Sequence, residues 1–205
     1  MTMRKKLWIT IACLSVILCT LVTGTIAWLT AETGPITNTF TPSNITVELK
    51  ETDGEDVVTG LTFQMIPGKT YAKDPLVTVT SDIKCYVFLV VNESDNLGTY
   101  IDYALDIDED AWQLVDGTTN VYYRVAEAGT DSYGVLVADK NAANPKWGDN
   151  EVYVKGSVTK DHMAALYNTD GSLKTENLPK LSFTAYACQY EGFNSAALAW
   201  AEINP

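Results

Sequence analysis

Few side chains in this 205-residue chain are of the types that carry out nucleophilic, acid–base or metal chemistry. The only histidine is His162, whereas zinc proteases bind their metal with at least two histidines, as in an H-E-x-x-H helix. We interpret His162 as an exposed polar residue on a short helix. The sequence has no G-x-S-x-G motif, and Cys85 and Cys188 lie inside apolar runs, not in the basic surroundings that activate a thiol. These residues predict a protein that is not an enzyme and has no cofactor.

One acidic run raises the question of calcium. Asp106, Asp108 and Asp110 alternate as at the start of an EF-hand loop. Ala111 stands where such a loop requires glycine, and Gly117 stands where it requires glutamate. We expect a solvated acidic turn with no metal site, and weak cation binding is the minor alternative.

Cys85 and Cys188 are the only cysteines beyond residue 28. They lie in the apolar runs nearest the two ends of the predicted domain. Two interpretations are open: a disulfide, if the two strands are neighbours, or two buried thiols that act as small apolar residues. A chain of this size builds a core without disulfides, so a disulfide-rich scaffold is not expected.

The N-terminal residues predict an export signal. Three basic residues precede an uncharged run at 7–29, which ends in small residues typical of a cleavage site. The candidate cleavage region is Thr25, Ala27, Trp28 and Leu29. We predict a cleaved signal peptide at 1–28. Because the run is long enough to cross a bilayer, an uncleaved anchor is the alternative, but no basic residue follows directly to stop transfer.

The composition restricts the possible partners. Residues 1–28 contain three of the 14 basic side chains and none of the 26 acidic ones, so the remaining chain has a formal charge of −15. Nucleic acid and anionic lipid both require a basic surface. We therefore expect no nucleic-acid partner, and contact with a membrane only through the signal segment. Repulsion between such acidic subunits would be relieved by salt.

From residue 44 onwards the sequence has the alternation of β-strands. Ile45, Val47 and Leu49 alternate with polar residues, and about nine such runs, including 61–66, are separated by turn signals. Short helices are expected at 161–167 and 195–203, the second capped by Asn194. The pattern predicts an all-β sandwich at 44–205 with one or two short helices.

The run at 85–91 is apolar on both faces. Cys85 and the alternate residues after it form one face, and Tyr86, Phe88 and Val90 form the other. Such a strand lies either in the centre of a sandwich or beneath a neighbouring molecule. Tyr86, Phe88 and Val90 are therefore candidates for a subunit-packing face.

Residues 29–43 precede the predicted domain as an arm. Pro35 and Pro42 each remove a backbone donor, so the arm belongs at a sheet edge or outside the fold. It is either a disordered tail or a strand lent to another subunit. In the second case Ile36 and Phe40 are the anchors, each contributing about 1.5–3 kcal/mol if fully buried.

Three stretches resemble the TasA/camelysin family of exported Gram-positive proteins. GTIAWLTAETGPITNTFTPSNITVEL at 24–49 is similar to that family's signal exit and mature start, and FTAYACQYEGFNSAALAW at 183–200 is similar to its closing strand and helix. MIPGKTYAKDPLVTVTSDIKCYVFLVV at 65–91 resembles its Pro-Gly turn and central strand, but this match is generic. Phe88 and Val90 stand where relatives often carry polar or basic residues, and Trp28 is bulky for its position.

The resemblance implies a jelly-roll-like β-sandwich that polymerises into extracellular fibres of a biofilm matrix. Its partners would be other copies of itself and a SipW-type signal peptidase. Residues 29–40 would complete the sheet of the next subunit. The alternatives are a monomeric cell-surface binding module or adhesin and, less favoured because of the single His162, a camelysin-like metalloprotease.

Overall fold

The computed structural model describes residues 3–14, 42–53, 56–58, 62–141 and 143–203. The chain divides into two compact units, 1–41 and 42–205. In the first unit, residues 3–14 form a helix with exposed side chains. The predicted cleavage region (Thr25, Ala27, Trp28, Leu29) and the predicted anchors (Ile36, Phe40) lie outside the described residues. Within the described ranges, no helix has the length and apolar character needed to cross a membrane.

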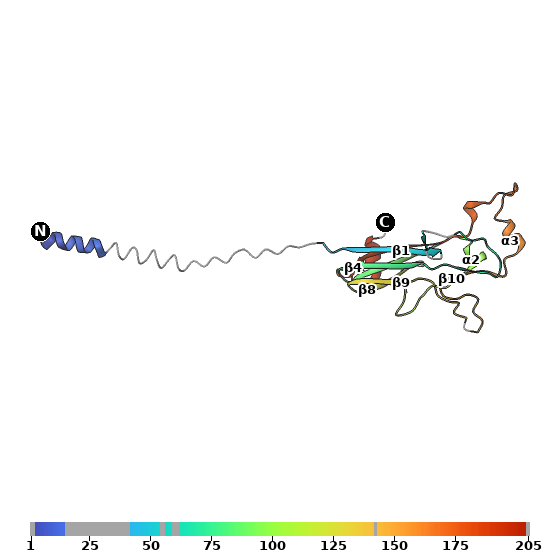
Figure 1. Cartoon of the computed structure of the whole chain (residues 1–205), viewed down its shortest axis with the longest axis horizontal. Helices are drawn as coiled ribbons and strands as arrows, with labels where there is room; N and C mark the ends of the chain where they lie inside the picture. The colour runs from blue at the N-terminus through green and yellow to red at the C-terminus, as the bar shows by residue number, and fades with distance from the viewer. Residues whose placement is uncertain (1–2, 15–41, 54–55, 59–61, 142, 204–205) are drawn as a thin grey trace. The chain divides into compact units, whose positions relative to one another are not determined.

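The second unit is built mainly from antiparallel strands (Figure 1). The strands are β1 (Ile45–Asp53), β2 (Asp56–Val58), β3 (Thr70–Ala72), β4 (Leu76–Ser81), β5 (Cys85–Glu93), β6 (Ile101–Asp102), β7 (Gln113–Leu114), β8 (Val121–Ala126), β9 (Gly129–Gly134), β10 (Glu151–Val154) and β11 (Leu181–Gln189). The helices are α2 (Leu97–Tyr100), α3 (Lys160–Ala164), the 3-10 helix η1 (Thr175–Asn177) and α4 (Ala196–Ile203). The predicted fold class, an all-β sandwich with short helices, is confirmed.

Two four-stranded sheets form the sandwich. Their strand orders are β2-β1-β4-β9 and β11-β5-β8-β7, and a smaller sheet has the order β3-β10-β6. Val77 and Val79 of β4 pack with Val87 and Leu89 of β5 in the core, all at most 1% exposed. The alternation of apolar residues seen in the sequence therefore directs one side of each strand into this core.

Helix α4 covers the outer face of the second sheet. Phe88 is fully buried and Tyr86 is 5% exposed, and the Phe88 ring lies 5.3 Å from that of Trp200 on α4. Ala196 and Ala199 of the helix belong to the same cluster, and Val90 packs against it. The prediction that Tyr86, Phe88 and Val90 form a subunit-packing face is therefore wrong, because the chain's own C-terminal helix occupies that face.

The N-terminus of α4 also differs from the prediction. The Oγ of Ser195 accepts a hydrogen bond from the N–H of Leu198 at 3.3 Å, so Ser195 occupies the capping position expected for Asn194. Leu198 is 55% exposed, on the side of α4 away from the sheet. Only one face of α4 therefore packs on the sheet, and Leu198 lies on the other face.

Candidate functional site

Strand β11 lies at the edge of its sheet and pairs only with β5. At its two ends the N–H of Tyr190 donates to the carbonyl of Lys84 (3.0 Å), and the N–H of Ser94 donates to that of Lys180 (2.9 Å). The even-numbered residues therefore bond to β5, since bonding alternates along an antiparallel pair. Backbone groups of the odd-numbered residues point away from β5, and in the described part of the chain they have no backbone partner. These residues are Leu181, Phe183, Ala185, Ala187 and Gln189.

Strand β1 has a shorter free edge. It pairs with β4 along Ile45–Lys50, and with β2 only from Glu51 onwards. The N–H of Asp82 donates to the carbonyl of Asn44 at 3.2 Å, which again sets the alternation. Ile45, Val47 and Leu49 then direct their backbone groups outward, where the described residues provide no partner strand.

The free edges of β1 and β11 lie on the same side of the sandwich, because β1 packs against β11 across the core. We refer to these two edges together, Ile45–Leu49 and Leu181–Gln189, as the open side. An added strand on the open side would find unpaired N–H and C=O groups, and an extended peptide binds such an edge by β-augmentation.

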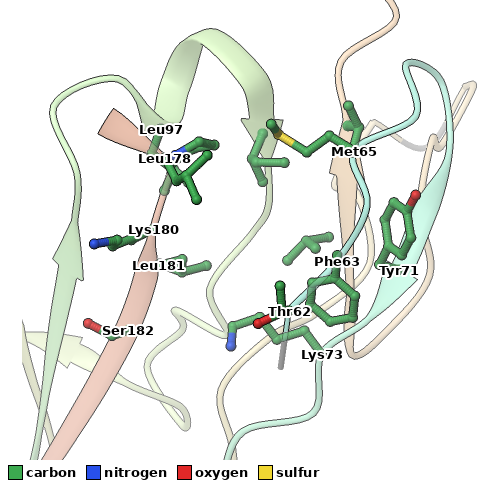
Figure 2. Close-up of a pocket in the computed structure, with 14 residues that line it drawn as sticks. Thr62, Phe63, Met65, Tyr71, Lys73, Leu97, Leu178, Lys180, Leu181 and Ser182 are labelled. Atoms are coloured by element: carbon green, nitrogen blue, oxygen red, sulfur yellow. The ribbon is translucent and has the colours of Figure 1, made fainter. Parts of the chain in front are cut away.

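A mainly apolar pocket of about 420 Å³ lies at the beginning of β11 (Figure 2). The rings of Phe63 and Tyr71, 5.1 Å apart, lie on one side of it, and Leu97, Leu178 and Leu181 lie across from them. Its other lining residues are Thr62, Met65, Lys73, Ile101, Val152, Val154, Pro179, Lys180 and Ser182. Leu181 and Ser182 belong both to the pocket and to β11, so the pocket continues the open side.

A buried ion pair connects β1 with the pocket wall. Lys73 and Glu51 are each 8% exposed, and the Lys73 ammonium donates to the Glu51 carboxylate. The same ammonium lies 5.4 Å from the centre of the Phe183 ring on β11. Next to the ion pair, the N–H of Thr52 donates to Oδ1 of Asp74 at 2.8 Å. These contacts fix the end of β1 against the segment that follows β3.

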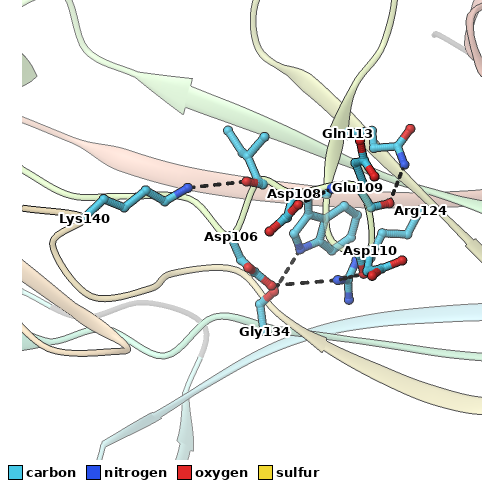
Figure 3. A network of polar contacts seen from close by, with 10 residues as sticks. Asp106, Asp108, Glu109, Asp110, Gln113, Arg124, Gly134 and Lys140 are labelled. Carbon is cyan, nitrogen blue, oxygen red and sulfur yellow. Dashed lines mark hydrogen bonds and ion pairs between the residues drawn. The ribbon is translucent and has the colours of Figure 1, made fainter. Parts of the chain in front are cut away.

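The acidic run at 106–110 is held by basic side chains (Figure 3). A terminal nitrogen of Arg124 donates to the carbonyl of Asp110 at 2.7 Å and lies 3.8 Å from Oδ2 of Asp106. The Lys140 ammonium donates to the carbonyl of Ile107 at 3.4 Å. Within the described ranges, no three His, Cys, Asp or Glu side chains are grouped so that they could hold a metal ion. Arg124 and Lys140 therefore donate to backbone carbonyls of this run.

His162 has a local structural role. Its Nδ1 accepts a hydrogen bond from the N–H of Thr159 at 3.2 Å, and the Thr159 hydroxyl accepts one from the N–H of His162 at 3.3 Å. This reciprocal capping box begins helix α3. His162 is exposed, which confirms its interpretation as a polar residue on a short helix.

Cys85 and Cys188 are both free thiols. Their strands are neighbours, as the disulfide interpretation required, but Cys188 is opposite Tyr86 and Cys85 is opposite Gln189. This offset of one residue directs the two side chains to opposite faces of the sheet, so the disulfide alternative is wrong. Burial raises the pKa of both thiols, that of Cys188 to about 11.

Both thiols should therefore react slowly in the folded protein. The thiolate is the reactive form, and at a pH of about 8 a thiol with a raised pKa is almost entirely protonated. With residues 29–205 and a colorimetric thiol reagent, we expect slow labelling of native protein and rapid labelling of two thiols in denaturant. Rapid labelling of both without denaturant would contradict the buried positions, and no labelling in denaturant would indicate a disulfide.

These observations define a class, an antiparallel β-sandwich whose described residues leave the open side unpaired beside an apolar pocket. No family model, curated protein or solved structure matches this chain.

Proposed function

We propose that this chain is a secreted structural protein that assembles into extracellular fibres by lending its arm to the open side of the next subunit. The observation that supports this most directly is the open side, where β11 and the Ile45–Leu49 part of β1 lack an outer partner among the described residues. Exposed edges of this kind promote association, and natural proteins usually block them. A function that requires an added strand explains why these edges are left open.

The position of the arm favours donation to another molecule. Residue 40 is separated from β1 by only 41–44, so a strand that ends at Phe40 must reverse within these residues to pair with its own β1. Donation to a second copy needs no such reversal. Each subunit then donates its arm to one neighbour and accepts the arm of another on its open side. Such head-to-tail contacts extend into a filament unless they close a ring.

Export and charge agree with this function. The predicted signal at 1–28 would direct the chain out of the cell, to the extracellular matrix or the cell surface, with a SipW-type peptidase as its processing partner. The charge of −15 beyond residue 28 resists nonspecific association and makes assembly sensitive to salt. The resemblance to the TasA/camelysin family supports a biofilm matrix as the setting. We do not propose the camelysin-like metalloprotease that the resemblance also implies, because the sequence has only one histidine, His162, for a zinc site.

Removal of the arm provides the test. We expect residues 29–205 to form filaments visible by electron microscopy, and a chain that begins at Asn44 to remain monomeric, because only the first contains the donor strand. Circular dichroism of both chains controls for folding. Filaments from both chains, or from neither, would remove the donor role from the arm.

The runner-up function is a monomeric surface-binding module. The apolar pocket favours it, since pockets of a few hundred Å³ with a few polar groups are typical of ligand sites. Sedimentation distinguishes the two proposals. A monomer of residues 29–205 at high concentration and in salt would support the module and contradict the fibre.

A further inference from the structure

We infer that the strand that accepts the arm is β11, and that the pocket at its beginning receives Phe40 of the neighbouring subunit. This inference rests on the proposed function, since it requires a donated arm. It adds the acceptor strand, the direction of the added strand and the cavity that receives an anchor.

Among the described edges, β11 is the best suited to accept a strand. It is nine residues long, it contains neither proline nor a charged residue, and five of its residues direct backbone groups outward. Edge strands normally carry charge, proline or a bulge that prevents added pairing. The sequence of β11 has no charge and no proline, and its register with β5 is continuous, without a bulge. The free part of β1, Ile45–Leu49, has only three outward residues and carries Glu48. Strand β9, at the other edge of the sheet that contains β1, is six residues long and carries Asp131.

The pocket supplies a place for an anchor from the added strand. It lies at the Leu181 end of β11, so a strand laid beside β11 leads directly to it (Figure 2). A cavity of about 150 Å³ already accepts benzene, so a pocket of about 420 Å³ has room for a phenyl ring. Phe40 is the one aromatic residue between 29 and 43. The wall formed by Phe63 and Tyr71 offers it aromatic partners.

An antiparallel arrangement brings Phe40 to this end. With Phe40 beside Leu181, the alternation of the two strands places Ile36 opposite Ala185 on the core side. Ala185 is half-buried, and its small side chain leaves space for the larger Ile36. Thr39 then lies opposite Ser182 on the solvent side. A parallel arrangement would bring Thr39 to the Gln189 end, about 23 Å away along the strand.

Cross-linking between two different chains tests the acceptor strand. The donor is residues 29–205 with Thr39→Cys. The acceptor begins at Asn44, so it cannot lend an arm, and it carries Ser182→Cys, Gln189→Cys or, on β1, Thr46→Cys. Ser182, Gln189 and Thr46 are exposed, residues 42–205 form a compact unit with its own core, and both chains carry Cys188→Ala to remove the half-buried thiol. A short bismaleimide joins the cysteines, and the two chain lengths identify the mixed dimer on a gel.

We expect the mixed dimer with Ser182→Cys at several times the yield obtained with Gln189→Cys or Thr46→Cys. Preferential linkage to Thr46→Cys would assign the arm to β1, and linkage to Gln189→Cys would indicate a parallel strand. Each of these two results overturns the inference and leaves the proposed function intact. No mixed dimer at any position, together with no filaments from residues 29–205, would remove the proposed function as well.

A second measurement tests the pocket. Phe40→Ala should raise the concentration at which filaments form by about 10- to 100-fold, because a buried phenyl ring is lost from each contact. Thr39→Ala, which changes the solvent side of the same strand, serves as the matched control. It should change the concentration at which filaments form only slightly. Equal effects of the two substitutions would show that Phe40 does not enter the pocket.

Discussion

Trp200→Ala is expected to lower the free energy of unfolding by about 3–5 kcal/mol. Trp200 is 9% exposed, and its ring lies 5.3 Å from Phe88 and 5.5 Å from Tyr186. The substitution removes the largest side chain by which α4 holds the outer face of the second sheet. Urea or thermal unfolding of residues 44–205, followed by circular dichroism, measures the loss.

Leu198→Ala is the matched control on the same helix. Leu198 is 55% exposed, so its truncation should change the free energy of unfolding by no more than about 0.5 kcal/mol. The Trp200 variant should also bind a hydrophobic dye more strongly, because Tyr86 and Phe88 become accessible. Similar losses for the two variants would contradict the orientation of α4.

The strands of the sandwich could largely be predicted from local sequence, and the cover of the second sheet could not. Alternating residues such as Ile45 and Val47 indicate one buried face by their period alone. The run at 85–91 indicates two buried faces but not what covers each. In the structure α4, more than one hundred residues later, covers the outer face, and local periodicity contains no information about that pairing. The two-residue strands β6 and β7 are too short to show a period.

The relation between Cys85 and Cys188 depends on register. Their strands are neighbours, but a shift of one residue in the pairing reverses the face of every side chain. The register of Cys188 opposite Tyr86 follows from the whole β5 and β11 pair. Two cysteines at suitable ends of a domain are therefore insufficient to predict a disulfide.

The pocket was missed because its walls come from distant segments. Residues 62–66 were expected within a strand, but they are outside any strand, and Phe63 and Met65 are half-buried beside the pocket. The sequence feature that indicates this pocket wall is the Pro67-Gly68 turn directly after the run, because the turn returns the chain toward Tyr71. The partner across the pocket, the segment before β11, is distant in sequence and is brought near only by the fold.

Lys73→Met is expected to destabilise the domain by about 3–5 kcal/mol, because it leaves the Glu51 carboxylate buried without a partner. Both residues are 8% exposed, and their contact joins β1 to the segment after β3. The apolar stem of methionine retains most of the packing of lysine, so the loss reports on the unpaired charge. Chemical unfolding of residues 44–205 measures it.

The double variant Lys73→Met with Glu51→Leu separates charge from packing. Replacing a buried ion pair by apolar residues of similar volume is often neutral or stabilising, so most of the lost stability should return. Lys84→Ala is the exposed control: Lys84 and Glu127 are paired at 2.7 Å, but their side chains are 38% and 73% exposed, and solvent screens the attraction. If the double variant is as unstable as Lys73→Met, the lysine stem and its contact with Phe183 stabilise this end of β1, and the ion pair contributes little.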